Sequence, residues 1–475
     1  MNKDYPILVG GVFKKKDKKH EIKAPYDGHT AGTTYLATET DIEEATGAAK
    51  EALAVTAKLA PHERSTILHK ISTELDNRKE EISRVLSAEA GKPIKAARVE
   101  IDRSIFTFQY ASEEARRITG EIIPLDASPH GAGHTCFVKR VPIGPILGIG
   151  PFNFPMNLVA HKVAPALASG NPIVIKPASQ TPLTGLILAQ IVMEAGWPKG
   201  GFSMIPTPPS LAEIMVKDDR FKMLSFTGSP GVGWRLKNSA GTKKIALELG
   251  GNAGVIVRHD ADIEDAAARI AVGGFSYSGQ TCISVQRILV HEKVYDRFKK
   301  LFQEKVKALK VGDPADEATD VGPLIYAKEA DRVLEWINEA VEGGAKLLCG
   351  GAVVNGSVLE PTVLEKTTPD MKVACMEIFG PVVTLQPYDD IDDAYKVINE
   401  SDFGLQAGIF TNDLKAAFRA WDVLDVGGIN VGNVPTFRVD HMPYGGVKMS
   451  GLGREGIRYA IEEMTELRNL VINKL

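Results

Sequence analysis

The chain has 475 residues, enough for two or three domains, and its 44% hydrophobic and 24% charged residues are typical of a globular protein. A formal net charge of -4 provides no basic field for nucleic acid. We expect no signal peptide, because charged residues come early at the N-terminus, and no membrane helix, which needs about 20 apolar residues in a row. Four cysteines without CxxC spacing indicate neither a disulfide framework nor a metal site. We therefore expect a cytoplasmic protein with no metal, nucleic-acid or membrane partner.

The first quarter of the chain predicts helices. Residues 41–58, starting at Asp41, and residues 62–90 read as helices. A third helix is expected over 94–118, where apolar residues recur at helical spacing. The basic run 14–19 predicts a solvated turn between edge strands rather than a ligand site.

Short apolar strands then alternate with helices. The expected strands are 146–149, 172–176, 202–205 and 223–226, and the expected helices are 157–169, 181–196 and 209–218. Strands separated by helices of this length predict a parallel sheet with helices on both faces.

A second series of strands and helices follows the glycine pair at 250–251. It comprises expected strands at 253–257, 286–290 and 382–386, and expected helices at 262–275, 292–309, 327–343 and 391–400. This series predicts a second α/β domain. Residues 119–140 and 464–475 read instead as extended strands with little core of their own.

Cys282 is the strongest catalytic candidate. It ends the segment Gly-Gln-Thr-Cys at 279–282, and Glu248 ends an apolar run just before two glycines. A catalytic thiol must lose its proton, so it needs a base within reach, whereas a free cysteine is by default a small buried apolar residue. Because the predicted domain boundary lies between Glu248 and Cys282, we expect an active site in an interdomain cleft.

Seven segments, in order and nearly end to end, together resemble the aldehyde dehydrogenase superfamily. They are PFNFP at 151–155, KPAS at 176–179, FTGS at 226–229, LELGGN at 247–252, GQTC at 279–282, EIFGP at 377–381 and PYGGVKMSG at 443–451. The resemblance implies an α/β fold with three parts. These are a Rossmann-like cofactor-binding domain (1–118 and 138–249), an α/β catalytic domain (250–463) and a β-hairpin oligomerisation element (119–137 and 464–475). The last part implies a homodimer or homotetramer.

The same resemblance implies three catalytic roles. Cys282 would attack the aldehyde, forming a thiohemiacetal and then a thioester. Asn153 and the backbone N–H of Cys282 would stabilise the oxyanion, and Glu248 would activate the hydrolytic water. From the residues alone, Asn153 also fits a turn before proline, and Glu248 also fits a surface charge at a strand end.

A glycine-rich turn at 226–233 lies between a predicted strand and helix, and it can present backbone N–H groups to a pyrophosphate. The resemblance implies NADP or NAD as the cofactor, bound by Phe152, Lys176, Ser179, Gly228, Ser229, Gly233, Leu249, Glu377 and Phe379. Family members that prefer NAD often carry Glu where this chain has Ser179. Because serine does not repel a 2′-phosphate, we expect NADP to be used, alone or alongside NAD.

Four polar residues are expected along the aldehyde channel. They are Arg103, Asn157, His161 and Arg438, and each also fits a surface position. The segment 438–443 resembles the branch of lactaldehyde, phosphonoacetaldehyde and non-phosphorylating glyceraldehyde-3-phosphate dehydrogenases. Some phosphate-specific members carry Arg where this chain has Thr281, which leaves lactaldehyde open. We therefore expect oxidation of a small hydroxylated or anionic aldehyde to its acid.

Three alternatives stay open. The first is a broad-specificity or semialdehyde dehydrogenase with the same mechanism. The second is an enzyme that passes the thioester to coenzyme A, which Glu248 disfavours because such enzymes commonly lack this base. The third is a non-catalytic scaffold, which the intact set of Cys282, Glu248 and Asn153 disfavours.

Overall fold

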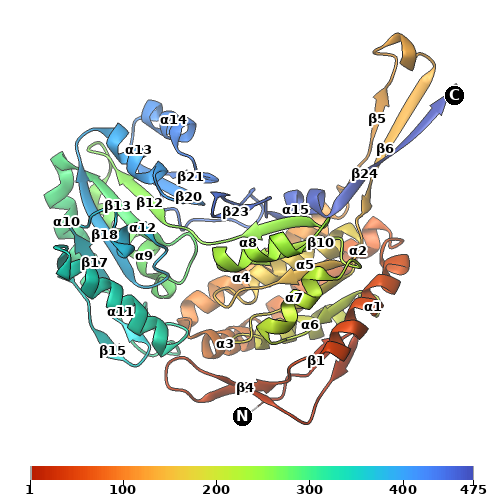
Figure 1. Ribbon diagram of the computed structural model, residues 1–475, viewed down its shortest axis with the longest axis horizontal. Helices are drawn as coiled ribbons and strands as arrows, with labels where there is room; N and C mark the ends of the chain where they lie inside the picture. Colours follow the sequence, from red (N-terminus) through yellow and green to blue (C-terminus); the bar gives the residue numbers. More distant parts are fainter. Residues whose placement is uncertain (1–2, 474–475) are drawn as a thin grey trace.

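The computed structural model describes residues 3–473, which form two lobes built on sheets and a projecting arm (Figure 1). The first lobe contains an eight-stranded sheet in the order β2-β1-β9-β8-β7-β10-β11-β23. Its strands are β1 (Ile7–Val9), β2 (Val12–Lys14), β7 (Ile146–Ile149), β8 (Ile173–Lys176), β9 (Phe202–Met204), β10 (Met223–Thr227), β11 (Lys244–Glu248) and β23 (Gly451–Leu452). The five strands from β9 to β11 are parallel, and the strand order reverses between β7 and β10.

Helices cover both faces of this sheet, which is why its central strands are buried and almost continuously apolar. One apolar cluster joins the sheet to α1 (Glu39–Thr56), α7 (Pro209–Lys217) and α8 (Pro230–Ser239). The opposite cluster contains α2 (Pro61–Asn77), α3 (Lys79–Ala90), α4 (Ile94–Glu114), α5 (Asn157–Ser169), α6 (Leu183–Glu194) and α15 (Ile457–Glu463).

Two helix expectations need correction. The helix expected over 62–90 is two helices, because Arg78 between them has non-helical backbone angles (φ -106°, ψ 12°). The first helix begins at Glu39 rather than Asp41, because Thr38 caps it and the Asp41 carboxylate accepts a hydrogen bond from the Thr38 N–H at 2.7 Å. The basic run 14–19 does connect two short strands, β2 and β3 (His20–Lys23).

The second lobe contains a seven-stranded sheet in the order β14-β17-β18-β13-β12-β20-β21, in which only β14 runs antiparallel to its neighbour. Its strands are β12 (Ala253–Val257), β13 (Val285–His291), β14 (Lys346–Cys349), β17 (Thr362–Glu365), β18 (Val382–Tyr388), β20 (Gln406–Phe410) and β21 (Gly428–Val431). Its helices are α9 (Ile263–Phe275), α10 (Glu292–Lys307), α11 (Ala327–Glu342), α12 (Lys372–Cys375), α13 (Ile391–Asn399) and α14 (Leu414–Val423). The helices α9 and α10 pack on one face, while α13 and α14 pack on the other.

The chain returns to the first lobe near its end. The short strand β23 pairs antiparallel with β11, next to Glu248, and α15 packs on α4 and α5. Part of the segment 250–463 expected to form the catalytic domain therefore completes the first sheet.

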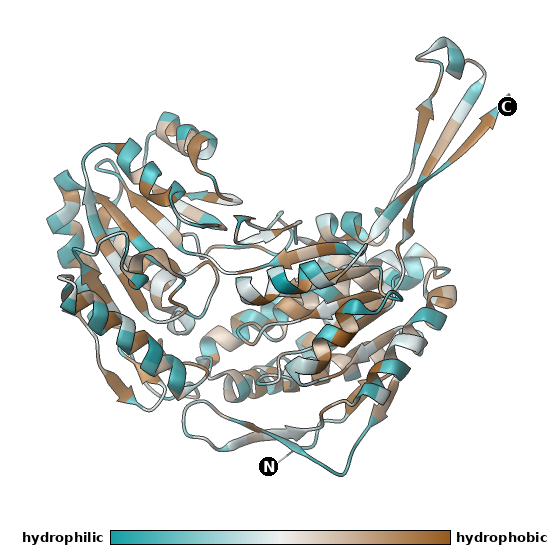
Figure 2. Ribbon diagram, viewed as in Figure 1, coloured by the Kyte–Doolittle hydropathy of each residue, from teal (hydrophilic) through white to brown (hydrophobic). Residues whose placement is uncertain are grey.

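The arm is a three-stranded antiparallel sheet in the order β24-β6-β5 that projects away from both lobes (Figure 1). Its strands are β5 (Glu121–Pro124), β6 (His134–Pro142) and β24 (Thr465–Asn473); residues 474–475 of the expected C-terminal strand lie outside the described residues. Figure 2 shows hydrophobic residues along these thin strands. Ile122 is 65% exposed, and Leu470 is 60% exposed.

Smaller strand pairs are β3 with β4 (Thr30–Thr34), β15 (Val353–Asn355) with β16 (Val358–Leu359) and β19 (Phe403–Gly404) with β22 (Val447–Lys448). No helix within residues 3–473 has the length and apolar character that a membrane crossing requires.

Candidate active site

The loop that carries Cys282 has an unusual backbone. After α9, Tyr277 and Ser278 both adopt left-handed conformations, with φ of 49° and 56°. A side chain at Gly279 would place its Cβ 2.1 Å from the carbonyl oxygen of Gly380, so only glycine fits there. This tight turn presents Cys282 to the space between the two lobes.

Two cavities meet at Cys282. A cavity of about 510 Å³ extends from the thiol toward α4, and a second cavity of about 500 Å³ extends toward the carboxyl ends of β7 and β10. Burial raises the pKa of the Cys282 thiol to about 12, while a hydrogen bond with the Tyr444 hydroxyl opposes that shift. A nucleophile between two cavities can contact a different ligand on each side.

Glu248 ends β11 and lines the second cavity together with Cys282. Its side chain is buried, and neither carboxylate oxygen has a hydrogen-bond partner among the described residues. Burial and the nearby Glu455 carboxylate raise the pKa of Glu248 well above its usual value. A buried carboxyl group without a hydrogen-bond partner, whose protonated form burial favours, is suited to exchanging a proton with a ligand in the cavity.

The two glycines after Glu248 allow the two lobes to approach each other. A Cβ at Gly251 would lie 2.2 Å from the carbonyl oxygen of Cys282, and a Cβ at Gly250 would lie 2.2 Å from Glu377 Oε2. Any larger residue would push the nucleophile loop away from β11.

Asn153 lies in the loop between β7 and α5. Its Nδ2 donates a hydrogen bond of 2.9 Å to the carbonyl oxygen of Gln280, two residues before Cys282. The amide is buried. The structure thus brings the three residues expected to be catalytic, Cys282, Glu248 and Asn153, to one place.

The second cavity lies where the strand order of the first sheet reverses, which is where open α/β sheets bind their ligands. The backbone at the start of α8 faces this cavity. Eight of the nine residues expected to bind the cofactor line it: Phe152, Lys176, Ser179, Gly228, Ser229, Leu249, Glu377 and Phe379. Gly233 instead packs behind the wall, where an added Cβ would lie 2.4 Å from Leu249 Cδ2. Sequence reasoning missed Gln180 and Pro209, which also line the cavity.

Polar groups at separate points of this cavity fit a long, partly anionic ligand. Burial lowers the pKa of Lys176 to about 8, and burial raises the pKa of Glu377 to about 7. Glu377 accepts a hydrogen bond of 2.8 Å from the N–H of Gly251, and the rings of Phe152 and Phe379 lie 5.8 Å apart, edge to face. The donor set, the aromatic pair and the helix N-terminus together fit a nicotinamide dinucleotide.

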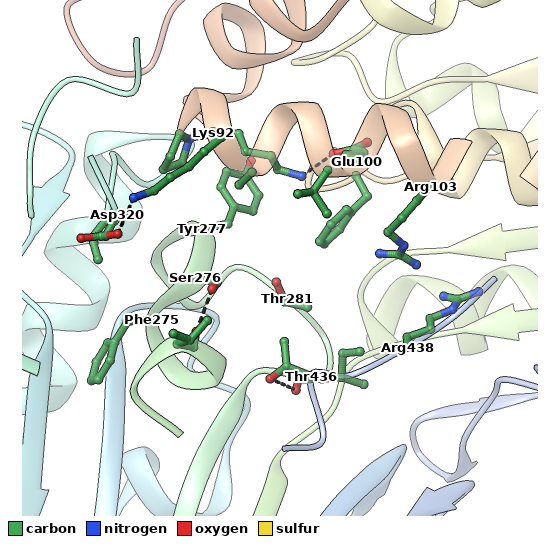
Figure 3. A pocket seen from close by; sticks show the side chains of 18 of the residues that line it. Lys92, Glu100, Arg103, Phe275, Ser276, Tyr277, Thr281, Asp320, Thr436 and Arg438 are labelled. Carbon is green, nitrogen blue, oxygen red and sulfur yellow. Dashed lines mark hydrogen bonds and ion pairs between the residues drawn. The ribbon is translucent and has the colours of Figure 1, made fainter. Parts of the chain in front are cut away.

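The first cavity has a mostly apolar wall that includes Phe154, Tyr277 and Ile283. Six charged side chains also line it, of which Lys92 is paired with Glu100 and Lys95 with Asp320; the other two are arginines. Figure 3 shows Arg103, from α4, and Arg438, from the loop after β21, pointing into the same space from opposite sides. Each arginine is also paired with a carboxylate, as described next.

Asp440 organises the residues behind the cavity. It accepts hydrogen bonds from Arg103 Nε and Nη2 (3.1 and 2.7 Å), Asn157 Nδ2 (3.1 Å) and His161 Nε2 (2.8 Å). Burial would raise the pKa of Asp440, but the hydrogen bond from His161 and the charge of Arg103 hold it well below its usual range. Asn157 and His161 are fully buried and do not line the cavity, so they support Arg103 indirectly.

Arg438 is held by Glu455, with 3.1 Å between Arg438 Nη2 and Glu455 Oε2. Lys162 also lies 3.2 Å from Glu455, so Lys162 and Arg438 hold the pKa of this buried carboxyl at about 2. Sequence reasoning missed Asp440, Glu455 and Lys162. The sequence offered one indication, since Lys162 is a charged residue on a mostly apolar helix, next to His161.

Comparison with known proteins identifies the family. The model of the aldehyde dehydrogenase family matches residues 12–470. The chain belongs to this family. It is an NAD(P)-dependent aldehyde dehydrogenase, as the sequence resemblance predicted.

Three relatives are similar over nearly the whole chain. A 3-sulfolactaldehyde dehydrogenase of Priestia aryabhattai is 45% identical over 472 residues, which are 99% of this chain and 98% of the relative. The crystal structure of aldehyde dehydrogenase 21 from Physcomitrella patens, in complex with the reaction product succinate, is 45% identical. It has a TM-score of 0.98, and the match covers 100% of this chain and 99% of that one. The glyceraldehyde-3-phosphate dehydrogenase GapN from Methanocaldococcus jannaschii, complexed with NADP, is 38% identical with a TM-score of 0.93, covering 97% of this chain and 100% of that one.

Proposed function

We propose that this enzyme oxidises a small aldehyde with a short anionic or hydroxylated tail to the carboxylic acid. The observation that carries the proposal is the pair of arginines, Arg103 and Arg438, in the cavity that ends at Cys282. A cavity with an apolar wall, a nucleophile and two guanidinium groups suits a short aldehyde whose tail accepts hydrogen bonds.

Glu248 accepts the proton of the Cys282 thiol and passes it to solvent, and Cys282 attacks the aldehyde carbon. The resulting oxyanion is stabilised by Asn153 Nδ2 and the N–H of Cys282. Phe152, Lys176 and Glu377 line the second cavity and would hold a nicotinamide dinucleotide there, which would supply the hydride acceptor for the oxidation. Glu248 then takes a proton from the water that hydrolyses the thioester on Cys282. The presence of Glu248 beside the thiol supports hydrolysis over transfer to coenzyme A.

The arginine contacts support an anionic tail. The Arg438 side chain is buried, and its Nε has no hydrogen-bond partner among the described residues. A buried guanidinium N–H without an acceptor costs free energy, which a substrate oxygen would recover. The names of the relatives agree, since sulfolactaldehyde, succinate and glyceraldehyde-3-phosphate all carry a short anionic group.

The catalytic assignment is tested with Cys282→Ala and Glu248→Gln. Cys282→Ala should abolish turnover but keep NADP binding, measured by fluorescence titration. Glu248→Gln should slow thioester hydrolysis more than its formation, so stopped-flow absorbance should show a burst of reduced cofactor followed by slow turnover. If Cys282→Ala keeps a tenth of wild-type activity, the proposed mechanism is wrong.

The substrate class is tested with Arg438→Ala and a panel of aldehydes. The panel contains sulfolactaldehyde, succinic semialdehyde, glyceraldehyde-3-phosphate, lactaldehyde and hexanal. The variant should lose roughly 2–3 kcal/mol of binding to an anionic aldehyde, seen as a KM about 30- to 150-fold higher, with little change for hexanal. Arg419→Ala, which removes an exposed arginine on α14, is the control. A wild-type preference for hexanal that survives in the variant would contradict the proposal.

We also infer that two or more copies of the chain assemble. Apolar side chains on α14 and β21 are exposed in one chain, and the arm has exposed apolar side chains of its own. The exposed fractions are 73% for Leu414, 59% for Phe418, 68% for Trp421 and 50% for Val431. Because β21 is an edge strand, a second copy's arm could extend this sheet and cover these side chains.

We infer a cytoplasmic location from the cysteines. All four, Cys136, Cys282, Cys349 and Cys375, are free, and a catalytic thiol needs a reducing environment. Fractionation of the native cell with thiol labelling would test this inference.

A further inference from the structure

The hydroxyl of Tyr444 lies beside the nucleophile. Its oxygen is 3.1 Å from Cys282 Sγ, and the Tyr444 side chain is buried. Within residues 3–473, Tyr444 provides the one hydrogen bond that the structure records for this sulfur. The hydroxyl therefore contacts the reacting atom directly.

The surrounding contacts fix the position of this hydroxyl. The backbone of Tyr444 forms two hydrogen bonds with the backbone of Glu455. The Arg438 guanidinium lies over the Tyr444 ring, 3.6 Å from its centroid, and Arg438 is itself paired with Glu455. The ring is thus held at its backbone and across its face, so the hydroxyl has little freedom to turn away from the sulfur.

We propose that Tyr444 is a further catalytic residue whose hydroxyl donates a hydrogen bond to the deprotonated Sγ of Cys282 and holds it for attack. This inference rests on the proposed function, because it requires Cys282 to be the nucleophile. Burial raises the pKa of Tyr444 well above 10, so the phenol keeps its proton and acts as the donor. A hydrogen bond to a charged acceptor is about twice as strong as one between neutral groups.

The charges around the sulfur explain why a donor is needed. Glu248 at the end of β11 and Glu377 after α12 both disfavour a negative sulfur, whereas Arg438 favours it. Among these described groups, the tyrosine hydroxyl is the one that shares a hydrogen bond with Sγ. Without it, the thiolate would face two carboxyl groups in a buried space.

The test measures the reactivity of the thiol without substrate. Wild-type enzyme and Tyr444→Phe are alkylated with iodoacetamide at fixed pH values between 6 and 10, and mass spectrometry follows the Cys282 peptide. The hydrogen bond should shift the thiol pKa by about one to two units, so the variant should react about 10- to 100-fold more slowly at each pH. Tyr388→Phe is the matched control, because its hydroxyl is buried too but donates to the carbonyl of Val257, and Tyr388 lines neither cavity at Cys282. The control should leave the alkylation rate of Cys282 unchanged.

A second measurement covers the case in which Tyr444→Phe fails to fold. Placing 3-fluorotyrosine at position 444 makes the phenol a stronger donor, so alkylation should become faster. The inference is overturned if the alkylation rate of Cys282 is unchanged in either variant. It is also overturned if Tyr444→Phe raises only the KM for a hydroxylated aldehyde such as lactaldehyde. Activity retained by Cys282→Ala would instead overturn the proposed function, so the two failures are distinguishable.

Discussion

Replacing Asp440 with Asn should destabilise the enzyme and weaken binding of anionic aldehydes. The carboxylate accepts four hydrogen bonds from Arg103, Asn157 and His161, and two of these partners are fully buried. Asparagine keeps one oxygen that can accept hydrogen bonds. Its NH₂ group would lie against the N–H donors of these partners, where no hydrogen bond can form. Hydrogen bonds to a charged group contribute about 1.5–3 kcal/mol each, and breaking a buried ion pair costs about 3–5 kcal/mol. Because the Arg103 side chain is partly exposed, we expect the free energy of unfolding to fall by about 3 kcal/mol, the lower end of the range for a buried ion pair.

Thermal unfolding at fixed protein concentration measures this loss, which for a chain of 475 residues corresponds to a Tm lower by roughly 3 °C. Because the pKa of Asp440 is held low in the folded state, its contribution is present above about pH 5 and is lost as the pH falls. The difference from wild type should therefore be constant from pH 6 to 8 and shrink below about pH 4. Asp392→Asn, which breaks an exposed ion pair with Arg419, should change the Tm little. Equal Tm values for wild type and Asp440→Asn at pH 7 would refute the role given to this carboxylate.

Three further predictions follow from the cofactor cavity and the surface. Ser179→Glu should move the cofactor preference at least tenfold toward NAD, because a carboxylate repels the 2′-phosphate of NADP and accepts a hydrogen bond from the ribose of NAD. Unchanged KM values for both cofactors would show that Ser179 does not face the ribose. Because burial lowers the pKa of Lys176 to about 8, calorimetry should show NADP affinity falling between pH 7 and 9, as the lysine loses its charge, and Lys176→Met should remove this dependence. Trp421→Glu should dissociate the assembly in light scattering, while exposed Lys415→Glu on the same helix should not; a monomeric wild type would contradict the inferred assembly.

The sequence predicted the architecture well where the apolar pattern was strong. We predicted three elements at their observed limits: the strands at 146–149 and 253–257 and the helix at 157–169. Each is a nearly continuous apolar run, which indicates an element that is buried on all sides. The break at Arg78 was missed, because the apolar pattern continues across it from one helix into the next.

The site was harder to predict, because it depends on which charges meet. The sequence proposed Arg103, Asn157 and His161 as separate channel residues, but it could not show that all three contact Asp440. Asp440 is more than 270 residues from His161 along the chain, so only the folded structure brings them together. Tyr444 lay within a recognised segment, yet its contact with Cys282 depends on a loop conformation that no local pattern encodes.

The pairing of β23 with β11 has a consequence for synthesis of the chain. About two hundred residues separate the two strands. The edge of β11 therefore has no strand to pair with until the whole second lobe has been translated. At about 5–20 residues per second, this delay is roughly 10–40 s. An unpaired edge exposed for that long can pair with other nascent chains. Ribosome-bound chains that stop before residue 451 should therefore bind chaperones more strongly than chains that extend past it.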